Sequence, residues 1–472
     1  MVFSSLYFLS VFLPLNLALY YLIKNRTYRN WVLIITSLVF YAWGEPVWIA
    51  LLIFSTLFVY FNALVAGRNR DNWKGRAAVA VSVTGNLLIL CFFKYSGFIV
   101  DNLNGLLGTD LQIIAFGLPI GISFYIFQTI SYVVDVYRGE TEAQQSFFKL
   151  LLFVSLFHQL VAGPIVRYKE ITGEIEHRVE TLEKFNYGVS RFNMGLGKKV
   201  LLANTAGKIC ESFLGTDYSR LPVTGAWLGI FLFALQIYFD FSGYSDMAIG
   251  LGKMFGFTYK ENFNYPYVSR SATEFWRRWH ISLGSFFRDY VYIPLGGNRR
   301  RYIRNLFVVW SLTGLWHGAS WNFVVWGLYY FVLIYIEKKF LWRVFEKLPA
   351  IVSRLYLWTA VLVGWVFFYH LDLGQALEFL GIMFGVKASA FSGPEVTIHF
   401  LNNAVFLFIA AVGCTPVMKH LGDRLKGLLP GKPDWIFVVG KVLKPLANMA
   451  VFVLSIIFLV GQSYNPFLYF RF

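Results

Sequence analysis

The chain has 472 residues, of which 57% are hydrophobic and only 14% are charged. Soluble proteins carry about a quarter charged residues, so this composition excludes the soluble globular class and predicts a polytopic membrane protein. The formal net charge of +16 is explained by basic cytoplasmic loops, with an anionic ligand or partner on that face as the alternative.

The cysteines and the first residues indicate a membrane protein without a disulfide framework, a cysteine metal site or a cleavable signal. Cys91, Cys210 and Cys414 lie far apart in apolar surroundings, which predicts neither a disulfide framework nor a metal site. Met1 leads directly into an apolar run without the basic start of a cleavable signal. We therefore expect the first span to be retained.

Four spans are expected in the first hundred residues, at 3–23, 31–43, 47–66 and 77–93, followed by an outer loop at 97–110. The second and third spans are separated by a Gly-Glu-Pro sequence that breaks a helix. Basic clusters follow the first and third spans, which places both ends in the cytoplasm and the N-terminus outside.

Between 112 and 214 the apolar stretches are broken more often. Glycine and proline interrupt the stretch at 112–137, and Gly163-Pro164 ends the next one, 147–165, which predicts a re-entrant segment. Residues 168–191 are rich in charge and predict a cytoplasmic loop. Residues 192–214 are expected at the membrane interface.

The strongly apolar stretch 224–252 contains two carboxylates, Asp240 and Asp246. Six residues apart, they do not share a face of an ideal helix. A carboxylate inside a membrane is costly unless it is paired. We expect arginine or hydroxyl partners for both, with a direct catalytic role as the alternative.

The segment 303–338 has 32 uncharged residues between Arg304 and Glu337. A single helix of that length would be about 48 Å long, whereas a bilayer core is about 30 Å thick. Glycine, serine and asparagine near the middle predict two helices, 303–316 and 321–338, with His317 at the turn and one long tilted helix as the alternative. A titratable side chain at that depth indicates a functional site, and a hydrogen bond to a neighbouring helix is the structural alternative.

Four more apolar segments complete the set, at 356–369, 376–385, 399–418 and 446–461. The sequence thus predicts an all-α membrane protein with roughly 11 transmembrane helices plus re-entrant and interfacial helices. We expect one integral domain, 1–472, with peripheral N-terminal spans (1–100), a core (112–340) and C-terminal spans (351–472). There is no internal repeat, which disfavours a secondary transporter.

The most basic region lies between 270 and 304, where eight arginines face two acidic residues. Residues 274–280 predict a helix in which Trp276 and His280 share a face, with Ser271 or Thr273 as its cap. An interfacial helix whose arginines reach the membrane surface explains this region. The functional alternative is a basic mouth for a phosphate-bearing ligand.

His280 and His317 are separated by a basic loop and one short helix, so both are candidates to line one cavity. Histidine is the side chain most easily poised as a base near neutral pH. The other plausibly buried histidine is His158, which is too few ligands to predict a metal site. No nucleophile-elbow, Walker or dinucleotide motif indicates another chemistry.

Seven ordered stretches resemble the membrane-bound O-acyltransferase family, and within it the bacterial alginate O-acetyltransferase-like branch. They are FYAWGEP (40–46), GISFYIFQTISYVVDVYRG (121–139), LVAGPIVR (160–167), YFDFSGYSDMAIGLGKMFGF (238–257), NFNYPYVSRSATEFWRRWHISLGSFFRDYVYIPLGGNR (262–299), LTGLWHGASWNFVVWG (312–327) and NPFLYFRF (465–472). The related D-alanyl transferases of teichoic acid share several of them.

The resemblance implies a helical bundle around a central tunnel or funnel, a catalytic histidine at His317 and a second family histidine at His280. It implies no bound cofactor and an acyl donor, acetyl-CoA or an acyl carrier thioester, that arrives from the cytoplasm. The acyl group would pass outward across the bacterial inner membrane to a polysaccharide, or first to an extracytoplasmic acetyltransferase partner.

The remaining site residues are assigned by their chemistry. Arg277 and Arg278 are expected to attract donor phosphate. Trp276, Trp279, Trp316 and Trp321 are expected to wall a dry tunnel. Asn322 or a backbone N–H near the turn is expected to stabilise the oxyanion. The rival functions are D-alanyl transfer to teichoic acid, glycan or lipid transport without chemistry, and a structural role in a secretion complex.

Overall fold

The computed structural model describes residues 1–112, 116–161, 163–427 and 434–461. Within these ranges the chain forms helices and no β-strand, which confirms the predicted all-α class. Five of these helices are long and apolar enough to cross a membrane, and a sixth candidate is a pair, α19 and α20, bent by 63°. Several predicted spans are divided into shorter helices, so the two counts differ.

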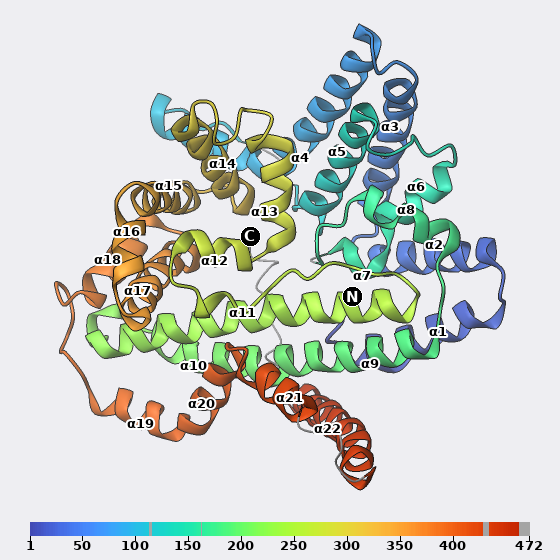
Figure 1. Cartoon of the computed structure of the whole chain (residues 1–472). Coiled ribbons are helices and arrows are strands. Elements are labelled where there is room, and N and C mark those ends of the chain that lie inside the picture. Colours follow the sequence, from blue (N-terminus) through green and yellow to red (C-terminus); the bar gives the residue numbers. More distant parts are fainter. Residues whose placement is uncertain (113–115, 162, 428–433, 462–472) are drawn as a thin grey trace. The chain divides into compact units, whose positions relative to one another are not determined.

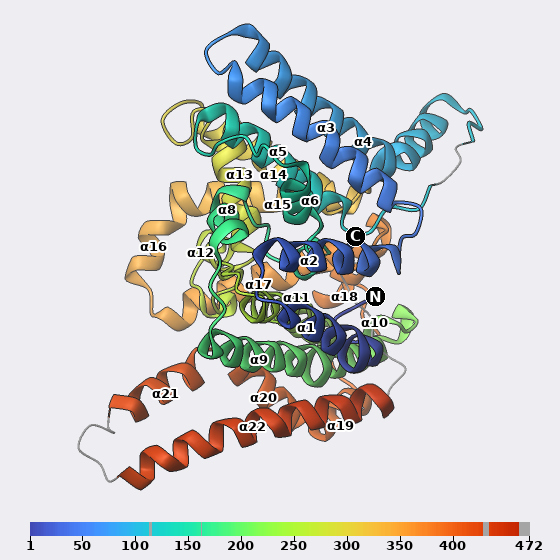
Figure 2. The same cartoon turned by 90° about the vertical axis from the view of Figure 1, so that its right-hand side faces the viewer.

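The chain divides into two compact units, and the first consists of residues 1–192 and 244–260. Its helices are α1 (Leu13–Leu22), α2 (Arg26–Ala42), α3 (Ile49–Arg68), α4 (Trp73–Leu107), α5 (Ile122–Arg138), α6 (Phe147–Ser155), α7 (Phe157–Leu160), α8 (Tyr168–His177), most of α9 (Leu182–Gly197) and the end of α11 (Val223–Met254). Figure 2 shows α3 and α4 side by side as a long pair.

The outer loop predicted at 97–110 is wrong, because α4 continues to Leu107. With 35 residues it is about 52 Å long and exceeds the thickness of a bilayer core. The polar residues that suggested a loop are accommodated by the helix itself. Asn102 donates its amide to the Phe98 carbonyl at 2.6 Å, and Gly108, the residue after α4, has a φ of 64°.

Two further regions contain helices whose bounds the sequence does not indicate. The charge-rich region 168–191, predicted as a cytoplasmic loop, contains α8 and most of α9, and its place in the cytoplasm stays a prediction. Ile171 and Ile175 of α8 are buried, so burial of one apolar face stabilises a helix in a charged sequence. The break in 147–165 already occurs at Leu156, between α6 and α7, before Gly163-Pro164.

The second unit consists of residues 193–243 and 261–472. Its helices are α10 (Asn204–Leu214), most of α11, α12 (Ala272–Arg278), α13 (Ile281–Phe287), α14 (Tyr302–His317), α15 (Trp321–Ile336), α16 (Trp342–Lys347), α17 (Ala350–Tyr369), α18 (Leu373–Met383), α19 (Pro394–Asn402), α20 (Ala404–Gly413), α21 (Val417–Gly427) and α22 (Asp434–Gly461). The predicted span 399–418 is therefore divided, and the motif 465–472 lies outside the described residues.

Helices α14 and α15 pack closely against each other (Figure 1). A Cβ atom at Gly314 would lie 2.4 Å from the Phe323 carbonyl oxygen, and one at Gly327 would lie 2.5 Å from the Trp310 carbonyl oxygen. Small residues allow membrane helices to approach closely and gain van der Waals contact. This crossing fixes the position of the C-terminal end of α14, where His317 lies.

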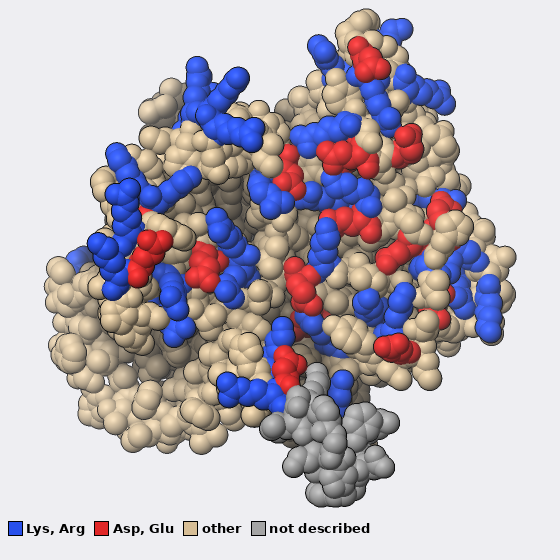
Figure 3. Space-filling model, viewed as in Figure 1, with Lys and Arg blue, Asp and Glu red and all other residues tan. Residues whose placement is uncertain are grey.

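Basic side chains gather on one face of the second unit. Figure 3 shows lysine and arginine over α14, α15 and α16, and the sequence there contains Arg299, Arg300 and Arg301 before α14 and Lys338 and Lys339 after α15. Such a cluster is typical of the cytoplasmic ends of spans.

Candidate active site

The turn predicted between the two halves of 303–338 is confirmed. Helix α14 ends at His317 and α15 begins at Trp321. The first of the three residues between them is a glycine, and a Cβ atom at this Gly318 would lie 2.2 Å from the ring of Phe323. His317 is thus held at the end of α14, and it is 8% exposed.

Aromatic rings enclose the His317 imidazole. The ring centroids of Trp316, Trp326 and Phe368 lie 4.8, 4.9 and 5.0 Å from it, all edge to face. Phe323 stacks at 6.4 Å. These side chains exclude most water, and a dry setting strengthens the electrostatic effect of any charge that develops there.

The prediction that Trp276 and His280 share a helical face is wrong. Helix α12 ends at Arg278, the next residue is extended, and His280 precedes α13 with φ 44°. A left-handed backbone costs a non-glycine residue about 1 kcal/mol or more, and such strain is found often at functional sites. His280 is 3% exposed.

The start of α12 is fixed by two acceptors. Ser271 Oγ accepts the Glu274 N–H at 3.1 Å, as predicted for a cap. The buried Glu337 carboxylate accepts the N–H groups of Ala272 and Thr273 at 2.6 and 2.9 Å. An anion at a helix N-terminus is stabilising. The sequence analysis missed this role of Glu337, because 65 residues separate the carboxylate from the helix that it caps.

Asn262 orients His280, and the sequence analysis missed this residue too. Its side-chain oxygen accepts the Ser282 N–H at 3.1 Å and the Ser282 hydroxyl at 2.8 Å, and it lies 3.3 Å from His280 Nδ1. An oxygen that already accepts these bonds requires His280 Nδ1 to donate. Nε2 then carries the lone pair, and it has no hydrogen-bond partner among the described residues.

Trp316 brings the two histidines into one site. Its ring centroid lies 5.9 Å from that of His280 and 4.8 Å from that of His317. Phe241 covers His280 edge to face at 4.7 Å. The arrangement provides two buried imidazoles around one indole, which is a setting for proton transfer rather than for anion binding.

The two arginines assigned to the donor differ from each other. Arg277 is exposed, whereas Arg278 pairs with Glu274 at 2.8 Å and reaches the Asn264 carbonyl at 3.3 Å. Within the described part of the chain, Arg277 is therefore the more accessible of the two to an anionic ligand.

The tryptophans assigned to the tunnel wall also divide. Trp316 contacts both histidines. Trp276 contacts Trp326, one of the rings around His317, with ring centroids 5.3 Å apart. Trp279 stacks on Phe275 at 5.5 Å in the aromatic core. Trp321 is 56% exposed at the start of α15.

The polar residues near the turn and in α11 have structural partners. Asn322 donates its amide to the Phe367 carbonyl at 3.0 Å and accepts from Ser320. Asp240 pairs with Lys199 at 2.8 Å in the second unit. Asp246 belongs to the first unit and pairs with Arg191 at 2.6 Å. The expected arginine partner is found for Asp246, whereas the partner of Asp240 is a lysine, which the sequence analysis did not predict.

Two further histidines are buried, the predicted His158 in the first unit and His370 in the second, which the sequence analysis missed. His158 Nδ1 shares a 2.6 Å hydrogen bond with the Tyr259 hydroxyl. Within the described ranges, no three His, Cys, Asp or Glu side chains gather as metal ligands.

Long apolar helices and a buried pair of histidines define a membrane-embedded helical protein with a candidate acid–base site. The sequence model of the membrane-bound O-acyltransferase family (MBOAT) matches residues 5–371. This chain belongs to that family, and it is an acyltransferase.

Several curated relatives match the whole chain, and others match about half of it. It is 40% identical to a probable alginate O-acetylase AlgI of Pseudomonas putida, with all of both chains covered. It is 31% identical to a peptidoglycan O-acetyltransferase of Helicobacter pylori, over 100% of this chain and 98% of that one. It is 27% identical to a teichoic acid D-alanyltransferase of Bacillus subtilis, over 54% of this chain and 67% of that one.

Proposed function

We propose that this chain transfers an acetyl group from a cytoplasmic thioester, acetyl-CoA or an acyl carrier, to a hydroxyl of an exported or cell-surface polysaccharide. The observation that carries the proposal is the buried pair His280 and His317, both in contact with Trp316, in a member of an O-acyltransferase family.

His317 acts as the general base in this proposal. It removes the proton of the acceptor hydroxyl, whose oxygen attacks the thioester carbonyl. The new C–O bond forms as the C–S bond breaks, and the thiolate leaves and takes up a proton. The aromatic enclosure supports this role, because water that entered the site would compete with the acceptor hydroxyl.

His280 orients the donor or His317 through its Nε2, and Asn262 holds its tautomer. Arg277 attracts donor phosphate at the basic face. An N–H near the turn after His317, or the second amide hydrogen of Asn322, stabilises the oxyanion.

The membrane arrangement that fits this chemistry has roughly 11 spans around a central tunnel or funnel, in the bacterial inner membrane. The donor enters from the cytoplasmic side, where basic residues gather. The acetyl group leaves on the other side, to the glycan directly or through an extracytoplasmic acetyltransferase.

The full-length similarity to acetyl transferases of alginate and peptidoglycan favours acetyl over D-alanyl transfer, since similarity to the D-alanyltransferase covers about half of the chain. The acceptor proposed is therefore a glycan.

The test measures base-labile acetate on the envelope and on exported polysaccharide. We expect wild type to carry acetate and the His317→Ala variant, at matched membrane levels, to lose it by at least a hundredfold, as for loss of a general base. The exposed His420 gives the control, and His420→Ala should retain acetate.

Unchanged acetate in His317→Ala would overturn the catalytic assignment and favour transport or assembly. Loss of alanyl esters in place of acetate would favour D-alanyl transfer.

A further inference from the structure

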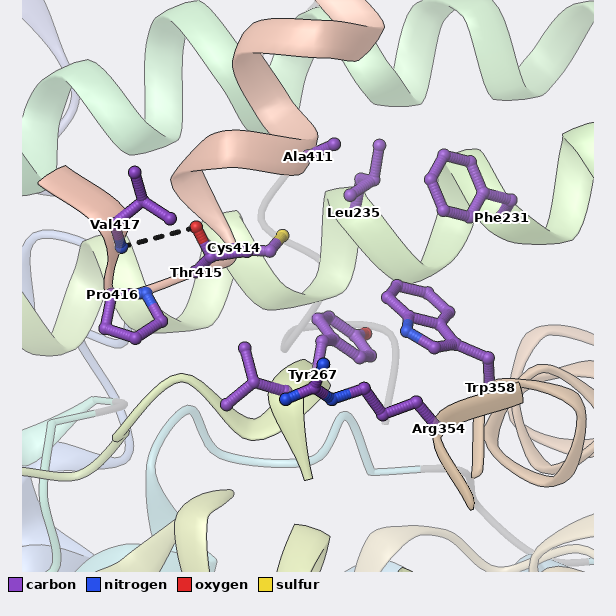
Figure 4. Close-up of a pocket in the computed structure, with 11 residues that line it drawn as sticks. Phe231, Leu235, Tyr267, Arg354, Trp358, Ala411, Cys414, Thr415, Pro416 and Val417 are labelled. Atoms are coloured by element: carbon purple, nitrogen blue, oxygen red, sulfur yellow. Dashed lines mark hydrogen bonds between the residues drawn. The ribbon is translucent and has the colours of Figure 1, made fainter. Parts of the chain in front are cut away.

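A pocket of about 530 Å³ lies in the second unit, away from the two histidines. Helix α11 contributes Phe231 and Leu235, helix α17 contributes Arg354 and Trp358, and the α20–α21 connection contributes Cys414. Figure 4 shows these side chains around Tyr267. The volume lies in the range of protein sites for small organic ligands.

Most of the pocket wall is aromatic and apolar. Trp358 stacks on Tyr267, with ring centroids 4.6 Å apart, and Phe231 lies 5.5 Å from Trp358. The Tyr267 hydroxyl is already engaged, since it donates to the Ala234 carbonyl at 2.7 Å and accepts from Trp365 Nε1 at 3.2 Å. The wall therefore selects an apolar body and offers it few polar contacts.

Arg354 is the charged residue of this pocket. Its side chain extends from α17 toward Tyr267 (Figure 4), and it has no hydrogen bond or ion pair within the described part of the chain. A guanidinium with five unused donors beside an apolar cavity is complementary to a phosphate attached to a hydrocarbon chain.

The position of Arg354 along α17 indicates the depth of the pocket. Helix α17 begins at Ala350, so Arg354 lies about 6 Å along it and Trp358 about 12 Å. Five basic residues against two acidic ones, between 337 and 354, mark this end as cytoplasmic. Arg354 thus lies at the level of the lipid headgroups, and Trp358 lies at the level of the acyl chains.

We propose that this pocket binds one anionic phospholipid of the cytoplasmic leaflet, with its phosphate on Arg354 and one acyl chain along Trp358, Phe231 and Leu235. Anionic lipids are concentrated in that leaflet and bind basic pockets between spans. The bound lipid links α11, α17 and the α20–α21 connection. This site is independent of the acyl-transfer reaction.

The experiment titrates the purified full-length protein with phosphatidylglycerol and counts bound lipid by native mass spectrometry. We expect one tightly held phosphatidylglycerol per chain and binding about tenfold weaker or more in Arg354→Ala, because a charge-assisted bond pair is lost. Phosphatidylethanolamine should bind as weakly to wild type as phosphatidylglycerol binds to that variant.

Two further variants keep the test decisive. Ala411 lines the pocket and is exposed, so Ala411→Phe should fill the pocket and weaken binding without removing a charge. Arg343, a basic residue of the same region outside the pocket lining, is the matched control, and Arg343→Ala should bind like wild type. Phosphatidylglycerol should raise the thermal midpoint of wild type and of Arg343→Ala only.

Equal binding by wild type and Arg354→Ala would overturn the proposal. So would equal affinity for glycerol phosphate, which indicates an anion site without an acyl pocket, or displacement of the lipid by acetyl-CoA, which assigns the pocket to the donor.

Discussion

At the scale of single residues, the informative feature is the strained His280 and the oxygen that faces it. Asn262 Oδ1 accepts two bonds from Ser282 and lies 3.3 Å from His280 Nδ1. The other ring nitrogen is thereby left to act as an acceptor. Outer partners of this kind set the tautomer of functional histidines.

We expect Asn262→Ala to lower turnover by roughly tenfold or more, as for loss of an orienting partner, because the His280 tautomer is no longer fixed. The measurement is single-turnover acetyl transfer in membranes, with kcat and KM determined separately, and kcat should carry the loss. Asn264 is exposed, so Asn264→Ala is the control. A change in thermal stability with unchanged kcat would reduce Asn262 to a structural role.

At the scale of elements, the close contact of α14 and α15 determines where the residues of the site lie. Gly314 and Gly327 each face a carbonyl oxygen of the opposite helix. A Cβ atom added at either glycine would lie closer to that oxygen than van der Waals contact allows. A methyl group at either position has to push the helices apart. Because His317 ends α14 and Trp326 lies on α15, such a shift also alters the aromatic enclosure.

We expect Gly327→Ala to lower the free energy of unfolding by about 1–3 kcal/mol, the usual cost of overpacking, and to lower activity in proportion to the shift of His317. The thermal midpoint in detergent measures the first effect. A Cβ atom at Gly105 of α4 meets no atom within 4 Å, so Gly105→Ala should be neutral or stabilising. Equal midpoints for the two variants would contradict close packing at the crossing.

At the scale of the whole molecule, a buried polar network holds the first unit together. Glu180, between α8 and α9, accepts from Arg26 at 2.7 Å and from Tyr20 at 2.6 Å, and it pairs with Arg29 at 2.9 Å. Burial would raise the pKa of the Glu180 carboxyl, but the hydrogen bonds from Arg26 and Tyr20 lower it to about 2.

We expect Glu180→Gln to destabilise the protein by about 1–3 kcal/mol near pH 7, because Arg26 and Arg29 lose their charged acceptor. The native pKa, about 2, lies below the ordinary value of 4.5. The stabilisation by Glu180 is therefore complete above about pH 5 and is lost as the pH falls toward 2. The thermal midpoints of wild type and Glu180→Gln, measured from pH 7 to pH 3, should therefore approach each other as the pH falls.

The control for this series is Glu142→Gln. The Glu142 side chain is 89% exposed and pairs with Arg70 at 3.4 Å, so its removal should leave the midpoint nearly unchanged at every pH. If the difference in thermal midpoint between wild type and Glu180→Gln stays constant down to pH 3, the stabilisation by Glu180 comes from packing and not from its charge.

The sequence by itself determined the all-helical membrane class, the turn at His317, a cap at Ser271 or Thr273 and the need for partners at Asp240 and Asp246, because apolar period, helix breakers and the cost of buried charge are local properties. It did not identify the lysine that pairs with Asp240. Only the tertiary structure decided the left-handed backbone of His280, its tautomer through Asn262 and the Glu337 contact with α12. Each of these depends on a partner that lies elsewhere in the chain, and residue spacing carries no record of such a partner.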